Sequence, residues 1–309
     1  MNPDPRPPAI SIGRRTLMQG ALLLGAASAS VAMAQPVMQH QVPPGLKPGP
    51  KGPRVFMDYD QQELDWAYDQ APWAPNTAEI FKRNAQQSAA ALARLGPPLQ
   101  LSYGAKEIEK IEVYRTRQPK APIHVFIHGG AWRTGSARAA AYMAENYVDA
   151  GAVFVAVDFN NVGEVDGSLL VMADQVRRAV AWIKRNASTF GGDPGRIYVS
   201  GTSSGAHLAG VVLTTAWESS FGLPADTVKG GLLCSGMYEL TPVSLSARAS
   251  YVKFTPETID QLSAQRHLNH LNAPLVVAYG TLETPEFQRQ NRDFVAPLQA
   301  ARKPVTLLV

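Results

Sequence analysis

Apolar runs and amphipathic stretches alternate along most of the chain after residue 108. Five short, nearly continuous apolar runs predict buried strands, at 123–127, 153–157, 197–200, 230–234 and 275–279. A further strand is predicted at 305–309, and the apolar–polar alternation of 108–114 predicts a half-exposed strand near a sheet edge. Helices are predicted between the strands, at 137–150, 171–187, 206–213 and 285–301. Strands that alternate with helices predict an α/β class domain with a doubly wound, mostly parallel sheet.

Before the first of these strands the pattern is different. Aromatic residues alternate with acids from residue 55 to 75, and we expect this stretch to pack over the domain as a cap. Asn76 is a candidate cap for a helix that runs to about Leu95, where Gly96-Pro97-Pro98 ends it. Residues 55–105 are therefore predicted to form a helical N-terminal cap segment, and residues 236–272 a second, irregular insertion.

The first 34 residues have the pattern of an export signal. Arg14 and Arg15 form a twin arginine, an apolar segment runs from Gly20 to Val31, and small residues at Ala32 and Ala34 suit cleavage after Ala34. The apolar segment is too short for a stable membrane span, although an uncleaved N-terminal anchor is the alternative. We expect a periplasmic or secreted protein with a Pro- and Gly-rich linker at 35–54 and a catalytic domain at 55–309.

Composition narrows the possible functions. The 309 residues are 45% hydrophobic and 17% charged, which is typical of a globular domain with a sizeable core. The formal net charge is +4, and no basic run indicates nucleic-acid binding. Cys234 is the single cysteine, which excludes an internal disulfide. Neither a metal-ligand spacing nor a phosphate-binding glycine loop occurs, so the sequence implies no metal and no cofactor.

The segment Gly201-Thr202-Ser203-Ser204-Gly205 lies between a predicted strand and a predicted helix. A G-x-S-x-G sequence in that context is typical of a nucleophile elbow, a sharp turn that exposes a serine hydroxyl. Only Ser203 has a glycine two residues away on both sides, so Ser203 is the candidate nucleophile. Its neighbour Ser204 is expected to contribute its backbone N–H group alone.

A second glycine motif, His128-Gly129-Gly130-Ala131-Trp132, directly follows the predicted strand at 123–127. Two adjacent glycines allow backbone N–H groups to turn toward an oxygen atom. The N–H groups of Gly129, Gly130 and Ser204 are therefore the candidate oxyanion hole, each donor contributing on the order of 3 kcal/mol to a lower barrier. The alternative is a tight turn without a chemical role.

Taken together, these motifs resemble the HGG-containing esterase group of the α/β-hydrolases, and most of all the kynurenine formamidase (arylformamidase) type. The resemblance covers about residues 55–309 and is carried by several short pieces: Tyr103-Gly104, HGGAW at 128–132, Gly192-Asp193-Pro194, GTSSGAHLAG at 201–210, SGMYEL at 235–240 and YGTLETPEF at 279–287. It implies an α/β-hydrolase fold and a triad acid after the seventh strand, at Glu283. Glu286 and Asp193 are weaker candidates for the acid.

The sequence offers no histidine at the position expected for the base of the triad. In this fold the histidine follows the acid, and none of the six histidines does; they are His40, His124, His128, His207, His267 and His270. We expect His124 and His207 to be packing residues and His128 to brace the glycine loop. Because residue 309 falls inside the predicted last strand, the expectation is a sequence shortened at its carboxyl end, with the last part of the fold and the histidine beyond it.

These features predict a serine hydrolase that cleaves a small carboxylic ester or an aryl formamide through an acyl-enzyme on Ser203. Trp132, Phe159 and Tyr238 are candidate walls of an aromatic pocket, or else core residues. Export favours a general carboxylesterase over tryptophan breakdown, which is a cytoplasmic task. The alternative is a catalytically inactive binding protein, or a fragment of the hydrolase that lacks the histidine. The acyl group, the leaving group and the oligomeric state stay open.

Overall fold

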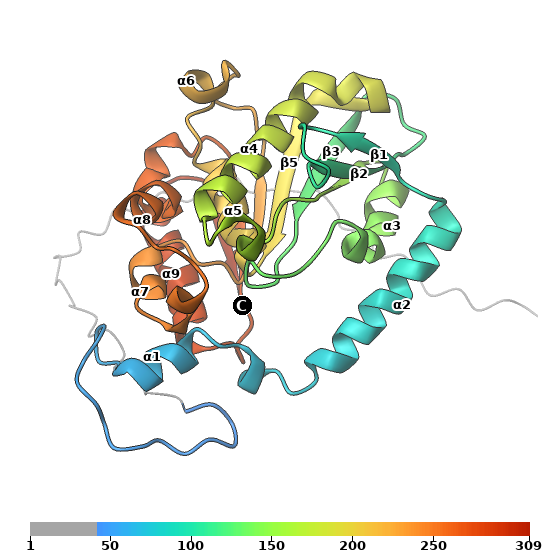
Figure 1. The fold of residues 1–309 in the computed structure, drawn as a ribbon. Helices are drawn as coiled ribbons and strands as arrows, with labels where there is room; N and C mark the ends of the chain where they lie inside the picture. The colour runs from blue at the N-terminus through green and yellow to red at the C-terminus, as the bar shows by residue number, and fades with distance from the viewer. Residues whose placement is uncertain (1–41) are drawn as a thin grey trace, which may run out of the picture. The chain divides into compact units, whose positions relative to one another are not determined.

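An eight-stranded sheet organises residues 42–309, the part of the chain that the computed structural model describes (Figure 1). Its strands are β1 (Leu99–Ser102), β2 (Lys110–Tyr114), β3 (Ala121–Ile127), β4 (Val153–Val157), β5 (Gly192–Thr202), β6 (Gly231–Cys234), β7 (Leu275–Ala278) and β8 (Val305–Leu308). The spatial order is β1-β2-β4-β3-β5-β6-β7-β8. Strand β2 is antiparallel to both of its neighbours, β1 and β4, and all other pairs are parallel, so the predicted doubly wound, mostly parallel sheet is confirmed. The predicted export signal and His40 lie outside the described residues.

Strand β2 corrects one expectation. It lies between β1 and β4 and is mostly buried, whereas its alternating pattern predicted a half-exposed strand. The polar positions that produced the alternation are Glu109 and Glu112, which are each 3% exposed. Their carboxylates are buried because Arg178 and Arg138 pair with them, each at 2.7 Å. Two buried carboxylates, each paired with a partly exposed arginine, thus gave the sequence pattern of an exposed strand face.

The long predicted helices are all present. The α-helices are α1 (Gln61–Ala67), α2 (Thr77–Leu95), α3 (Ala141–Asp149), α4 (Leu169–Asn186), α5 (Ser204–Leu213), α6 (Trp217–Phe221), α7 (Leu240–Ser244), α8 (Pro256–Leu262) and α9 (Pro285–Ala300). Short 3-10 helices lie at η1 (Ala71–Trp73), η2 (Arg138–Ala140), η3 (Val162–Val165), η4 (Ala187–Phe190), η5 (Ala247–Ser250) and η6 (Ala264–His270). Asn76 precedes α2 but makes no side-chain cap hydrogen bond, which corrects its predicted role. No helix in residues 42–309 is long and apolar enough to cross a membrane.

The two faces of the sheet are covered differently. On one face His124 of β3 stacks on Tyr147 of α3, with ring centroids 4.0 Å apart. Alternate residues of β3 point to the opposite face, which α4 and α5 cover in Figure 1, and they are fully buried. Beyond α3, the first face carries an open groove of about 600 Å³ over β5 to β8, lined in part by Tyr198 and Val276.

Two segments outside the sheet frame its carboxyl edge. Helix α1 is fixed against α9, because Thr284 donates a hydrogen bond to the Ala67 carbonyl and Tyr68 donates one to Glu286. Helix α2 packs instead on η2 and α3, where the Ser88 hydroxyl donates a hydrogen bond to the Ala139 carbonyl and accepts one from the Tyr142 N–H. In Figure 1 the N-terminal segment therefore runs from α9 past the edge of the sheet to α3.

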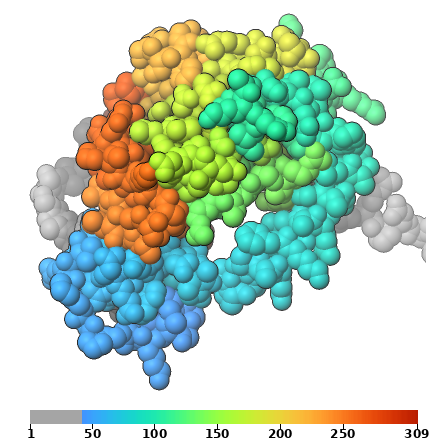
Figure 2. Space-filling model, viewed as in Figure 1, coloured from blue at the N-terminus to red at the C-terminus, as the bar shows by residue number. Residues whose placement is uncertain are grey.

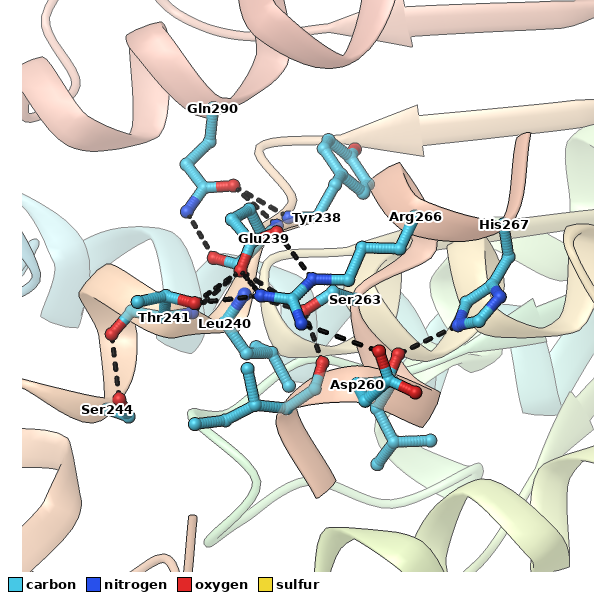
Figure 3. A network of polar contacts seen from close by, with 12 residues as sticks. Tyr238, Glu239, Leu240, Thr241, Ser244, Asp260, Ser263, Arg266, His267 and Gln290 are labelled. Atoms are coloured by element: carbon cyan, nitrogen blue, oxygen red, sulfur yellow. Dashed lines mark hydrogen bonds and ion pairs between the residues drawn. The ribbon is translucent and has the colours of Figure 1, made fainter. Parts of the chain in front are cut away.

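The insertion between β6 and β7 is fixed by a polar network (Figure 3). Arg266 pairs with Glu239 through two hydrogen bonds of 2.9 and 2.6 Å. Gln290 of α9 accepts hydrogen bonds from the backbone N–H groups of Tyr238 and Glu239 and donates one to the Glu239 carbonyl. The insertion predicted to be irregular thus contains α7, η5, α8 and η6 in a fixed arrangement.

Candidate active site

Ser203 stands at a sharp turn between β5 and α5. Its backbone has φ 54° and ψ −123°, a conformation that is strained for a residue with a side chain. Its N–H group donates a 2.8 Å hydrogen bond to the carbonyl of Cys234, the last residue of β6. A Cβ atom on Gly205 would overlap with the carbonyl groups of Ile127 and His128. The glycine is needed because the end of β3 passes directly over the turn.

The His128-Gly129-Gly130 loop packs against this turn. A Cβ atom on Gly129 would lie 2.6 Å from the Thr202 carbonyl oxygen and 3.3 Å from the Ser203 Cβ. Among the described residues, no acceptor binds the backbone N–H groups of Gly129 and Gly130. The N–H group of Ser204 begins α5, where the first helical N–H groups have no partner within the helix. Three candidate oxyanion donors therefore surround Ser203.

Ser204 does more than the sequence predicted, because its buried hydroxyl accepts a 3.1 Å hydrogen bond from the backbone N–H of Trp132. This bond ties the glycine loop to α5. The indole N–H of Trp132 in turn donates to Nδ1 of His207 at 3.2 Å, and Nε2 of His207 bonds to the Leu262 carbonyl at 3.0 Å. Burial lowers the pKa of His207 to about 4, so this histidine is neutral and both ring nitrogens are occupied.

The other described histidines also have partners away from Ser203. His128 bonds to the Gly129 carbonyl at 3.0 Å and stacks on Phe159, which braces the loop as predicted. His124 bonds to Ser200 at 2.7 Å and is buried in the core. His267 bonds to a carbonyl of α8 and His270 to a neighbouring asparagine side chain. Within residues 42–309, no histidine is hydrogen-bonded to Ser203 or Glu283.

Glu283 follows β7 at the same edge of the sheet as Ser203. Its Oε1 atom accepts a 2.6 Å hydrogen bond from the Ser235 hydroxyl and a 2.7 Å hydrogen bond from the Gly280 N–H. Its Oε2 atom accepts a 3.2 Å hydrogen bond from Gln70, a residue of the N-terminal segment. Ser235 follows Cys234, whose carbonyl holds the N–H of Ser203. The end of β6 therefore joins the candidate serine to the candidate acid.

Glu286 and Asp193 have structural surroundings. Glu286 is fully buried, accepts two 2.7 Å hydrogen bonds from Arg289 and accepts a third from Tyr68. Asp193 lies at the far end of β5 from Ser203 and accepts hydrogen bonds from the Gly195 N–H and from Arg196. Both carboxylates are thus paired with an arginine, whereas Glu283 forms no ion pair among the described residues and bonds to Ser235 at the end of β6.

A cleft of about 970 Å³ opens beside Ser203. Its floor includes Thr202, Ser203 and the loop after β3, and its far wall is one face of α2. The α2 residues that line it recur every three or four positions, as one helix face does: Phe81, Asn84, Ala85, Ser88, Ala89 and Leu92. Figure 2 shows the surface hollowed between the cyan α2 and the green segment next to it. Arg248 of η5 closes part of another side.

The aromatic residues predicted as pocket walls lie elsewhere. Trp132, Phe159 and Tyr238 are 2%, 5% and 0% exposed, and none lines the cleft beside Ser203. Trp132 is turned inward by the left-handed backbone of the glycine loop, and with Phe159 it lines a separate cavity of about 120 Å³. Tyr238 stacks on Phe294 of α9, with ring centroids 4.1 Å apart. The structure thus gives the packing alternative for all three residues.

Metal binding has no support from side-chain clusters in the described part of the chain. No group of three or more histidine, cysteine, aspartate or glutamate side chains there is arranged to hold an ion. The arrangement around Ser203 instead suits chemistry at a carbonyl group, because it combines a hydroxyl, unpaired N–H donors and a carboxylate.

The strand order, the strained serine turn after β5 and the acid after β7 define an α/β-hydrolase. Comparison with known proteins agrees with this class. The family model BD-FAE matches residues 111–229. Kynurenine formamidase from Salmo salar is 30% identical over 260 residues, which are 79% of this chain and 85% of the relative. Esterase LipC from Mycobacterium tuberculosis is 28% identical and covers 67% of this chain and 53% of its own length.

Solved structures share the fold. Esterase B from Lactobacillus rhamnosis superposes with a TM-score of 0.59 at 17% sequence identity, and the match covers 76% of this chain and 84% of the esterase. The protein therefore belongs to the kynurenine formamidase family of α/β-hydrolases, in the group that also includes esterases, and it is a hydrolase. The resemblance inferred from the sequence motifs is confirmed.

Proposed function

We propose that the protein hydrolyses a small carboxylic ester or an aryl formamide through an acyl-enzyme on Ser203. The observation that carries this proposal is the strained backbone of Ser203 beside three N–H groups without a partner in the described structure. Strain at such a position persists only where the surrounding structure enforces it, and it is concentrated at functional sites. The named relatives, an esterase and a kynurenine formamidase, act on the same two classes of bond.

The reaction has two balanced halves. Oγ of Ser203 attacks the carbonyl carbon, its proton passes to a base, and the N–H groups of Gly129, Gly130 and Ser204 bind the oxyanion. The leaving alcohol or amine departs with a proton, and water then releases the acyl group and restores the hydroxyl. Glu283 would orient a histidine as the base. We assign no histidine to this role, because each described one is held by other partners.

A general carboxylesterase that acts outside the cytoplasm fits the sequence best. The twin-arginine pattern in the first 34 residues supports export, and the cleft has room for a small ester next to the apolar face of α2. Formamide cleavage is the second candidate, supported by the kynurenine formamidase relative.

Labelling with a fluorophosphonate probe tests the nucleophile. We expect stoichiometric labelling of the full chain at the peptide that contains Ser203, and loss of this label in Ser203→Ala. Ser219→Ala, which removes an exposed serine on α6, is the matched control and should be labelled like the wild type. Labelling at another serine, or none in a folded protein, would contradict the proposal and favour a binding role.

The bond class is tested by turnover. Hydrolysis of p-nitrophenyl acetate is compared with hydrolysis of an aryl formamide such as N-formylkynurenine, at equal enzyme concentration. We expect kcat/KM for the ester to be the larger of the two. A larger value for the formamide would reverse the order of the two candidates and leave the role of Ser203 intact.

A further inference from the structure

Arg248 is a buried cation in the wall of the cleft. Its side chain belongs to η5 in the insertion between β6 and β7, and the residue is only 9% exposed. Two of its nitrogens are used: Nη1 donates to the Tyr251 hydroxyl at 2.9 Å and Nη2 donates to the Tyr68 carbonyl at 2.8 Å. Its Nε atom is buried and has no hydrogen-bond partner in the described structure. The guanidinium group therefore keeps donors that the protein does not satisfy.

The charge of Arg248 is also uncompensated. Within residues 42–309, no carboxylate forms an ion pair with it, and its neighbours are neutral: the Trp132 ring 5.5 Å away and the Phe287 ring 6.0 Å away. Cation–π contacts of this kind offset part of the desolvation of a guanidinium group. An isolated buried charge is nevertheless costly, and such charges are normally paired. A partner from outside the chain would complete this site.

The other charged residues of the cleft wall strengthen the positive field. Arg133 lies over the ring of Tyr251 at 4.9 Å, so the two arginines share one tyrosine. Arg138 also lines the cleft, but Glu112 already pairs with it. Asp69, the acid that lines the cleft, is exposed and accepts a hydrogen bond from the backbone N–H of Ala71. Positive charge at this wall is thus held near Tyr251.

From these contacts we propose that the substrate of Ser203 carries a carboxylate, and that Arg248 is the residue that binds it. This inference rests on the proposed function, because it places the carboxylate in the same cleft as the scissile carbonyl. A guanidinium group matches the two oxygens of a carboxylate with parallel N–H donors, which gives direction as well as strength. The apolar face of α2 then contacts the uncharged part of the substrate.

The surroundings of Arg248 are suited to recognition because they are fixed. The Tyr68 carbonyl follows α1, which Thr284 ties to α9. The insertion that carries Arg248 is pinned by the Arg266–Glu239 pair and by Gln290 in Figure 3. A charge held from two sides loses little freedom when a ligand binds.

Two esters with the same leaving group test the proposal in the full chain. The mono-p-nitrophenyl ester of glutaric acid carries a carboxylate, and p-nitrophenyl butyrate does not. We expect Arg248→Met to lower kcat/KM for the anionic ester by about 10- to 100-fold, and to change kcat/KM for the neutral ester less than about threefold. Arg248→Lys should keep part of the preference. Arg292→Met, which removes an exposed arginine beside Tyr279, should change neither value.

A binding measurement separates this inference from the proposed function. Titration calorimetry of Ser203→Ala with butyrate and with neutral butyramide requires no turnover. We expect butyrate to bind, and Arg248→Met in the same background to weaken its binding at least about tenfold without affecting butyramide. Equal losses for both esters, or no butyrate binding, would overturn the inference. Arg248-dependent butyrate binding without any ester turnover would overturn the proposed function and leave Arg248 as the carboxylate site of a binding protein.

Discussion

Ser203 and Glu283 lie at the same edge of the sheet but are held in different ways. On the serine side, which is the turn at Ser203 to Gly205, the position is fixed by backbone contacts. The Ser203 N–H donates a hydrogen bond to the Cys234 carbonyl, and the Gly205 backbone packs against the end of β3. On the acid side, the Glu283 carboxylate is held mainly by side chains, those of Ser235 and Gln70. Gln70 comes from the N-terminal segment, more than 200 residues away in sequence.

This difference indicates how each side responds to substitution. A site held by backbone packing cannot accommodate even one added methyl group, because that group would have to displace main-chain atoms. A site held by side-chain hydrogen bonds loses one bond at a time, and each bond contributes only about 1 kcal/mol. We therefore expect abrupt losses on the serine side and graded losses on the acid side, except at the carboxylate itself.

The largest effect is expected for Glu283→Gln. Removal of the charge that would stabilise a protonated histidine should lower kcat/KM for p-nitrophenyl acetate by roughly 10³- to 10⁴-fold. The folded state should be affected less, because the amide oxygen still accepts the hydrogen bonds from Ser235 and the Gly280 N–H, and only the bond from Gln70 is lost. Steady-state kinetics and urea unfolding measure the two properties.

Glu286→Gln is the matched control, three residues further along the chain, in the first turn of α9. It should leave the exposed Asp293 as the only acidic partner of Arg289 among the described residues and cost about 3 kcal/mol of unfolding free energy. Activity per folded molecule should stay within a few fold of the wild type. If Glu286→Gln loses activity and Glu283→Gln does not, the two carboxylates have been assigned the wrong way round.

Gly205→Ala tests the backbone packing of the serine side. The added Cβ would overlap with the Ile127 and His128 carbonyl groups, which cannot move without displacing β3. We expect a loss of about 4 kcal/mol or more in unfolding free energy. Gly49→Ala, where the nearest atom would be a side-chain oxygen at 3.4 Å, should cost little. Equal losses in both variants would contradict the difference between the two sides.

Lowering the pH should reduce the free energy of unfolding through the buried His207, which packs on the serine side. Burial lowers its pKa to about 4, whereas in the unfolded chain it is near 6.5. Between these two values the unfolded chain binds the extra proton, so the stability conferred by the neutral ring falls as pH falls, by up to about 3 kcal/mol. Urea unfolding between pH 7 and pH 4 measures this loss. His207→Gln should reduce the pH dependence, and an unchanged pH slope would exclude this contribution.

The smallest effects are expected at the partners of Glu283. Ser235→Ala should lower kcat/KM about tenfold, and Gln70→Ala a few fold, since each removes one hydrogen bond to the carboxylate. The double variant tells whether the bonds act together. A loss as large as that of Glu283→Gln from either single change would mean that the acid side is as rigid as the serine side.

Much of the fold could be predicted because its signals are local. The apolar runs gave β3 to β7, and the periodic stretches gave α2, α4 and α9 close to their observed bounds. The G-x-S-x-G pattern is a local signal as well, although the carbonyl groups that require Gly205 belong to Ile127 and His128, far away in the sequence. Strand β1 was missed since its four residues, Leu99–Ser102, carry a mostly exposed pattern. The burial of Glu112 was missed because its arginine partner lies 26 residues further along the chain.

The parts of the site that could not be predicted depend on contacts between distant segments. Nothing near Gln70 or Ser235 in the sequence indicates a bond to Glu283. The hydroxyl of Ser204 is similar, because its partner is a backbone N–H group 72 residues away. The sequence left Trp132 open between a pocket wall and a core residue, because the direction of its side chain depends on the left-handed backbone at Ala131 and Trp132; the structure buries it.

Helix α2 lines the cleft that would receive the substrate, whereas the proposed catalytic groups lie on other elements. One face of this helix forms a wall of the cleft, yet it contributes none of the groups that we propose act on the carbonyl. It is anchored to α3 through Ser88 rather than to the strands that carry Ser203 and Glu283. Substitutions at Phe81, Ala85 and Leu92 would reshape the cleft without changing Ser203, Glu283 or the proposed oxyanion donors. One surface helix thereby gives this hydrolase a route to new substrates, by evolution or by design.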